Sequence, residues 1–189
     1  MQDDYWEAKH LDTAISGDVN STPVVTLLNG IAGGRDNDER IGNQVVLEGV
    51  EMRLHVSNEA AVKDRLSQMR MLLVYDTQTN GAALTTTQVL DAVTLSAQLN
   101  WDNECRFHVV WDSVRALNMY GGSATGVDTY HWFFHKTFKL NQPVRYNSAG
   151  GTVASISWGS LYWIYFGPDA ASAQDFDLVG TARLTYVDY

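Results

Sequence analysis

Cysteine is nearly absent from this chain of 189 residues, because Cys105 is the only one. A single cysteine cannot form a disulfide within the chain, which excludes a small secreted scaffold stapled by disulfides. Proline occurs only at Pro23, Pro143 and Pro168, each beside turn-forming residues. Long hydrophobic runs are missing too, since no stretch approaches the roughly 18 consecutive apolar residues of a membrane span. We therefore expect no membrane partner.

The sequence motifs of common enzyme classes are also missing. The chain has no Walker-type loop, no dinucleotide-binding glycine fingerprint and no Gly-x-Ser-x-Gly elbow. The glycine-rich stretch 30–42 does not open a helix, so it lacks the context of a phosphate-binding loop. Cys105 carries no signature of a nucleophile. We therefore predict that the protein is not an enzyme and has neither catalytic nor cofactor-binding residues.

The first ten residues do not resemble a signal peptide.

The composition favours a folded domain with a large core. Hydrophobic residues make up 45% of the chain and charged residues 19%, which argues against disorder. Six Trp, nine Tyr and six Phe provide side chains that dominate both cores and interfaces. The net charge of −9 argues against the basic surface on which most nucleic-acid binding depends.

Alternation with period two dominates the chain and predicts an all-β protein. Residues Val46, Val50, Met52, Leu54 and Val56 are expected on one face of a strand. Stretch 69–75 is apolar at nearly every position and predicts a central strand covered on both sides.

Further strands follow from the same pattern. Phe107, Val109 and Trp111 alternate with more polar residues, and stretch 152–167 predicts two short strands bent at Gly159. About eight strands separated by turn clusters are typical of a sandwich or barrel. Short helices are expected only at 60–66 and 86–91. The long loop 78–106 is predicted to contact a neighbouring subunit.

Polar residues after the strand 69–75 suggest either a site or a turn. Asp76, Gln78 and Asn80 could face one way, but no partner stands at a useful spacing. Asn80-Gly81 adopts positive φ at low cost, so we interpret this end as a turn.

Metal sites are weakly indicated. His131 and His135 lie four residues apart on a predicted strand, about 13 Å at the usual rise per residue, which is too far for one zinc ion. We therefore predict no metal site. Asp36, Asp38 and Glu39 form either a solvated acidic loop or a set of oxygen ligands for calcium at subunit contacts.

Six phrases in order along the chain carry a resemblance to a known family. They are RIGNQVVLEGVEMRLHV at 40–56, MRMLLVYDTQTNGAAL at 69–84, NECRFHVVWDSVRAL at 103–117, FFHKTFKLNQPVRYN at 133–147, GSLYWIYFG at 159–167 and ARLTYVDY at 182–189. Together they resemble the capsid proteins of small circular Rep-encoding single-stranded DNA viruses, which include geminivirus-like and circovirus-like lineages.

The resemblance implies a single eight-stranded jelly-roll domain over residues 1–189, with two packed four-stranded antiparallel sheets. It implies self-assembly into a small icosahedral shell, by family analogy of sixty copies, around a single-stranded DNA genome. The protein would then lie in the virion, and in the host nucleus or cytoplasm during assembly, with an unknown host receptor. Family members usually begin with a basic arm, whereas this chain begins MQDDYWEAKH.

Candidate residues follow from this reading. Basic residues in or beside strands are candidates for nucleic-acid contacts, although salt bridges and snorkelling at sheet faces are the more usual role of such residues: Lys9, Arg53, Arg70 and Arg145. Aromatic residues in loops or near strand ends are candidates for subunit contacts: Trp101, Tyr120, Tyr130, Trp158 and Trp163.

Three alternatives remain open. A jelly-roll carbohydrate-binding module would use exposed aromatic rings and the polar stretch 76–80. A small satellite-virus-like coat protein would enclose RNA. A cupin-like metalloenzyme would need histidines clustered on one inner face.

Overall fold

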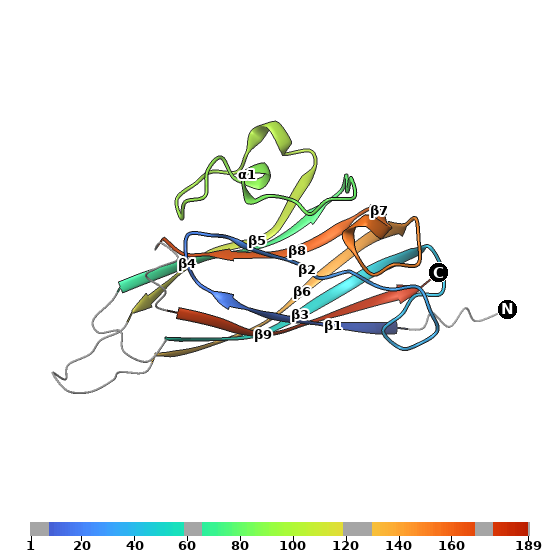
Figure 1. Cartoon of the computed structure of the whole chain (residues 1–189), viewed down its shortest axis with the longest axis horizontal. Coiled ribbons are helices and arrows are strands. Elements are labelled where there is room, and N and C mark those ends of the chain that lie inside the picture. Colours follow the sequence, from blue (N-terminus) through green and yellow to red (C-terminus); the bar gives the residue numbers. More distant parts are fainter. Residues whose placement is uncertain (1–7, 59–65, 119–129, 169–175, 189) are drawn as a thin grey trace.

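The computed structural model describes residues 8–58, 66–118, 130–168 and 176–188, most of which form two antiparallel sheets packed face to face (Figure 1). The five-stranded sheet has the order β1-β9-β3-β6-β7. Its strands are β1 (Ala8–Asp18), β9 (Phe176–Asp188), β3 (Gln44–Asn58), β6 (His131–Tyr146) and β7 (Ile156–Trp158).

The four-stranded sheet has the order β2-β8-β4-β5. Its strands are β2 (Val24–Leu27), β8 (Ser160–Phe166), β4 (Leu66–Asp76) and β5 (Phe107–Asn118). Three short helices lie between strands: α1 (Thr86–Val89) and the 3₁₀ turns η1 (Trp101–Asn103) and η2 (Val153–Ser155).

The pairing of strands defines a jelly roll. β1 pairs with β9, β2 with β8, β3 with β6 and β4 with β5, all antiparallel. The first half of the chain therefore runs antiparallel to the second half, and the resulting long hairpin is rolled into two sheets. The predicted fold class is confirmed. The extra strand is β7, whose short pairing with β6 makes one sheet five-stranded rather than four-stranded.

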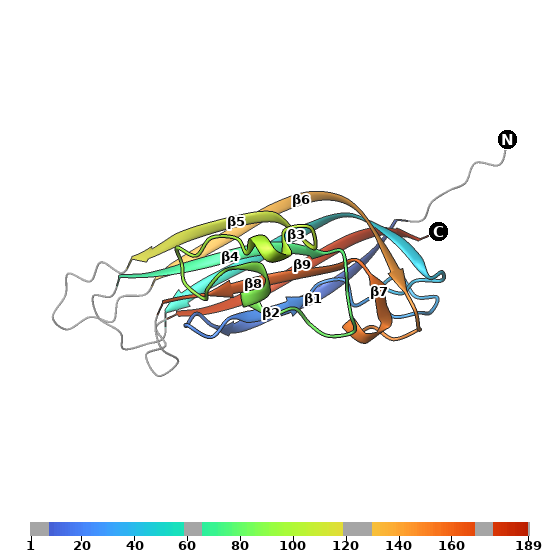
Figure 2. The same cartoon turned by 90° about the horizontal axis from the view of Figure 1, so that it is seen from above.

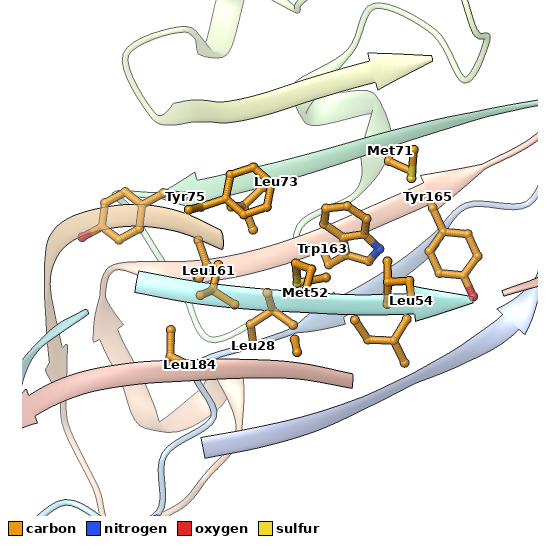
Figure 3. Packing of buried hydrophobic residues seen from close by; sticks show 14 of the residues in the cluster. Leu28, Met52, Leu54, Met71, Leu73, Tyr75, Leu161, Trp163, Tyr165 and Leu184 are labelled. Carbon is orange, nitrogen blue, oxygen red and sulfur yellow. The ribbon is translucent and has the colours of Figure 1, made fainter. Parts of the chain in front are cut away.

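The main core fills the space between the two sheets. Trp163 of β8 has no exposed surface and stacks on Trp111 of β5, with ring centroids 5.7 Å apart. Figure 3 shows Trp163 and Leu161 pointing toward Met52 and Leu54 of the opposite sheet. Large interdigitating side chains from both inner faces therefore hold the sandwich together.

Two β-bulges change which residues face this core. Relative to β9, strand β3 has one extra residue at Glu48, so Val45 and Leu47, rather than the predicted Val46, are buried with Val50. In β5 the extra residue is Val110. A bulge reverses the alternation of a strand beyond it.

The second bulge corrects a prediction about β5. Phe107 and Val109 pack on the outer side of the four-stranded sheet, whereas Trp111 packs into the main core. These three residues therefore do not share one face, contrary to simple alternation.

Segment 77–106 covers the outer face of the four-stranded sheet (Figures 1 and 2). Leu84, Val89 and Leu90 of this segment pack on Leu72 of β4 and Ile164 of β8 and form a second buried cluster. Strand β4 is therefore apolar on both sides, as its sequence predicts. The expected helix at 86–91 forms but ends at Val89. The expected helix at 60–66 falls almost entirely outside the described residues, and Leu66 already belongs to β4.

Candidate functional site

The polar residues that follow β4 have structural partners. Asp76 has no exposed surface, and its carboxylate accepts hydrogen bonds from Arg106 Nε at 2.8 Å and Arg106 Nη2 at 2.7 Å. Its Oδ1 also accepts a hydrogen bond from the backbone N–H of Gln78 at 2.9 Å. Thr79 is buried and shares a hydrogen bond with Ser160. This stretch closes a turn, as predicted, and Asp76 and Thr79 are not available to bind sugar hydroxyls.

Two of the four predicted nucleic-acid contacts lie in the interior. Lys9 is 4% exposed, and its Nζ donates to the carbonyl of Glu39 at 3.0 Å. Arg70 is 5% exposed and is held by the carboxylate of Asp112 at 3.0 and 2.6 Å. Both cations are committed to contacts within the chain, so neither presents its charge to a phosphate.

Arg53 and Arg145 are exposed on the outer face of the five-stranded sheet. The side chain of Arg53 is 71% exposed and pairs with Glu51 at 2.7 Å. Arg53 stands opposite His135 on β6, ten residues before Arg145, so the two arginines lie on the order of 30 Å apart along the sheet. They do not converge on one phosphate, and their role in nucleic-acid binding stays a prediction.

The aromatic candidates for subunit contacts divide by burial. Trp101 in η1 is 76% exposed and Trp158 in β7 is 36% exposed. Tyr130 is half-buried and packs edge-on against Phe176. Trp163 lies in the main core, so it cannot touch a neighbouring subunit. Tyr120 lies outside the described residues.

Large apolar side chains are exposed on three separate sides of the molecule. Trp101 belongs to the segment over the four-stranded sheet, and Phe133 lies on the outer face of the five-stranded sheet, where it is 74% exposed. Ile41 is 73% exposed, and its N–H donates to the carboxylate of Asp188 near the C-terminal end of β9. Single exposed apolar residues are common on protein surfaces, so these three are candidate anchors for contacts between proteins rather than a continuous apolar patch. Sequence reasoning missed Ile41 and Phe133, because apolar residues are usually buried.

Charged and histidine side chains cover much of the outer face of the five-stranded sheet. Arg183 donates to Asp12 at 2.7 and 2.6 Å and holds the pKa of that carboxyl below its usual value. The carboxylate of Glu51 accepts from Arg53, and His135 Nε2 lies 2.7 Å from it. These contacts lower the pKa of Glu51. A hollow of about 290 Å³ opens among Asp12, Glu51, Arg53, Thr181 and Arg183.

His55 and His131 meet on this same face. Nε2 of His55 lies 2.9 Å from Nδ1 of His131, although the residues are 76 positions apart in sequence. In the sequence the histidines look scattered, and only His131 and His135 stand at a spacing that suggests a pair. The cross-strand register that brings His55 to His131 was not readable from the sequence.

The acidic loop has an internal contact of its own. The backbone N–H of Asp36 donates to the carboxylate of Glu39 at 3.0 Å. Within the described residues, no group of three or more His, Cys, Asp or Glu side chains is arranged to hold a metal ion. Calcium at subunit contacts stays a prediction.

None of the helices in the described ranges is long and apolar enough to cross a membrane.

Comparisons with known proteins give only remote likenesses. No protein-family model and no curated protein match the chain. It is similar to a solved infectious bursal disease virus VP2 subviral particle, at 10% identity and TM-score 0.29, over 98% of this chain and 33% of that one. It is also similar to Desmodium yellow mottle tymovirus, at 11% identity and TM-score 0.33, over 95% of this chain and 87% of that one.

A second bursal disease virus structure, of the Gt strain, matches at 12% identity and TM-score 0.29, over 98% of this chain and 34% of that one. The chain thus spans about a third of the length of the bursal disease virus chains that it matches. Scores this low carry no argument by themselves, so the jelly roll rests on the strand pairing described above.

Proposed function

We propose that this chain is a structural capsid protein that self-assembles into a small icosahedral shell around a single-stranded DNA genome. The jelly-roll fold hosts capsid proteins, lectins and cupins alike, so the fold does not choose among them. The observation that carries the proposal is the placement of Ile41, Trp101 and Phe133 on three separate sides of the sandwich.

Separate apolar surfaces favour a closed shell over a simple dimer. A two-fold dimer needs one self-complementary surface, whereas contacts around several rotation axes use different surfaces of each subunit. Aromatic residues are favoured anchors at the centres of such contacts. The predicted contact residues Trp101 and Trp158 would then be joined by Phe133 and Ile41.

Light scattering and electron microscopy of the purified chain test this proposal. About sixty copies of a 21.0 kDa chain give a particle of about 1.3 MDa. Trp101→Ser, Phe133→Ser and Ile41→Ser should each lower the yield of particles without lowering the melting temperature. Gln98→Ala, a change at an exposed polar residue of the segment that carries Trp101, is the matched control and should assemble normally.

Two outcomes would count against the proposal. A wild-type chain that stays monomeric at all salt concentrations and pH values tested would overturn it. Particles that form equally well from all three variants would show that these surfaces are not subunit contacts.

The genome is tested on the particles themselves. Nucleic acid extracted from them should be destroyed by a nuclease specific for single strands and by DNase, but not by RNase. Sensitivity to RNase alone would favour the RNA satellite-like alternative. Arg53→Gln and Arg145→Gln should lower the nucleic-acid content if these exposed residues contact phosphate.

A carbohydrate-binding module is the second candidate because of the surroundings of Trp101. The ring is 76% exposed, and the exposed carboxylate of Asp102 lies beside it, whereas the side chains of Asn100 and Asn103 are hydrogen-bonded within the segment. A flat exposed ring beside an exposed acid suits stacking on a sugar. Binding to a glycan array by a monomeric wild-type chain, lost in Trp101→Ser, would favour this function over the shell.

A further inference from the structure

We propose that His55 and His131 form a binding site for one divalent transition-metal ion of the zinc, nickel or copper type. The two residues lie on the neighbouring strands β3 and β6, where His55 stands opposite Phe133 and His131 stands opposite Ser57. They are therefore diagonal neighbours on the outer face of the five-stranded sheet. Nε2 of His55 and Nδ1 of His131 point at each other across 2.9 Å.

The distance between these nitrogens is close to what a shared metal ion requires. Zinc binds imidazole nitrogen at about 2.0–2.1 Å in tetrahedral geometry, which separates two such nitrogens by roughly 3.4 Å. The pair must therefore open by about half an ångström, and the two rings must turn so that both nitrogen lone pairs converge on the ion. His131 is exposed, so its side chain can make such a movement without a shift of the backbone. The ion then replaces the hydrogen bond that joins the two rings.

Both imidazoles can stay neutral when the ion is bound. A histidine ligand binds metal through an unprotonated nitrogen and carries its proton on the other one. Here the protons would stand on Nδ1 of His55 and Nε2 of His131. No positive charge then has to be accommodated except that of the ion itself.

Ring stacking holds the pair in place. His55 stacks on Phe133 with ring centroids 4.6 Å apart and planes inclined by 17°. The rings of His55 and His131 lie edge to edge and nearly coplanar, with centroids 5.1 Å apart and planes inclined by 14°. Fixing the orientation of a ligand ring lowers the entropy lost when the ion binds. Besides being a candidate subunit contact, the exposed ring of Phe133 therefore orients the metal-binding ring of His55.

The remaining coordination positions face outward. His131 is exposed, so water can complete the coordination, or a residue from a neighbouring copy can do so in a particle. Asp177 of β9 stands in the same register row as Ser57 and His131, which places a carboxylate on this face. Imidazole ligands favour zinc, copper and nickel, whereas magnesium and calcium require oxygen.

His135 provides the matched control. It lies on the same face and the same strand as His131, but four residues along a strand separate them by about 13 Å. Its Nε2 lies 2.7 Å from the carboxylate of Glu51. Its removal should therefore leave the site intact.

Isothermal titration calorimetry of the full chain with zinc chloride tests the site. The protein should carry Cys105→Ser, because Cys105 is exposed and its thiol would bind zinc independently. We expect one strong zinc site per chain. His55→Gln and His131→Gln should each weaken zinc binding at least tenfold, while His135→Gln binds as the Cys105→Ser parent does. Nickel should compete for the site and magnesium should not.

Melting temperatures of all variants show whether they fold. Absence of zinc binding by the folded parent would overturn the inference. So would an equal loss of binding in His135→Gln, or unchanged binding in either His55→Gln or His131→Gln. None of these results depends on whether the chain forms particles.

Discussion

The buried carboxylate of Asp76 and the guanidinium of Arg106 form a two-point ion pair, with hydrogen bonds of 2.8 and 2.7 Å. The Asp76 side chain has no exposed surface and that of Arg106 is only 17% exposed. Asp76 ends β4, and Arg106 immediately precedes β5. The pair therefore links the residues just before and at the end of segment 77–106. It holds together the two points at which this segment leaves and rejoins the four-stranded sheet. The hydrogen bond to Asp76 raises the pKa of Arg106.

Breaking this ion pair should destabilise the protein strongly. Removal of one partner leaves a buried charge without compensation, which typically costs about 3–5 kcal/mol. We expect Arg106→Gln to lower the free energy of unfolding in urea by that order. Asp102→Asn, which changes an exposed acid in the same segment, should change it little. A loss for Arg106→Gln no larger than that of the control would mean that the pair is not important for stability.

Arg70 should hold segment 77–106 against the sheet. Its Nη1 donates to the carbonyls of Leu95 at 3.2 Å and Ala97 at 2.7 Å, while Asp112 accepts from the same guanidinium. Arg70→Met keeps the apolar stem but removes these bonds, so backbone amides near 90–100 should exchange hydrogen faster. Arg53→Met is the control, because Arg53 is exposed and pairs only on the surface. Unchanged exchange in Arg70→Met would refute this role.

Gly159 and Gly81 form a matched pair for testing the bend between β7 and β8. Both have positive φ, +85° and +81°. A Cβ at Gly159 would lie 2.6 Å from the carbonyl oxygen of Pro143 and 2.6 Å from Tyr75 Oη, whereas a Cβ at Gly81 meets nothing within 4 Å. Gly81→Ala should cost only the backbone strain, about 1–2 kcal/mol. Gly159→Ala should cost clearly more in thermal unfolding. Equal costs would show that the contacts can relax.

The Asp12–Arg183 pair should make stability depend on pH in the acid range. The hydrogen bond from Arg183 lowers the pKa of Asp12 in the folded state, so the unfolded chain binds a proton first as pH falls. The stabilisation is therefore full above about pH 4 and is lost as pH drops through the folded pKa.

Arg183→Gln should remove part of that dependence. The variant should be less stable than wild type at pH 6, and the two should converge near pH 2, as urea unfolding would measure. The effect should be small and should shrink in high salt, because the pair is exposed. Arg35→Gln removes the same charge from another exposed position and serves as the control. A constant difference between wild type and Arg183→Gln across this pH range would contradict the assignment.

Local pattern alone determined the class of this fold. Alternating apolar residues predicted strands, and the doubly apolar stretch 69–75 predicted a central strand covered on both sides. The bend at Gly159 and the turn after Asp76 were also predictable, because glycine, asparagine and aspartate act through local backbone geometry. These features depend on residues that are close together in the sequence, so they can be predicted from the sequence alone.

Only the tertiary structure decided which side chains meet and which stay exposed. Asp76 and Arg106 are 30 residues apart, and His55 and His131 are 76 apart, so their contacts depend on strand register. The bulges at Glu48 and Val110 reverse the alternation locally, which moved Val45, Leu47 and Trp111 into the core. Register and bulges arise from pairing between distant strands, and that pairing leaves no signal in the local sequence pattern.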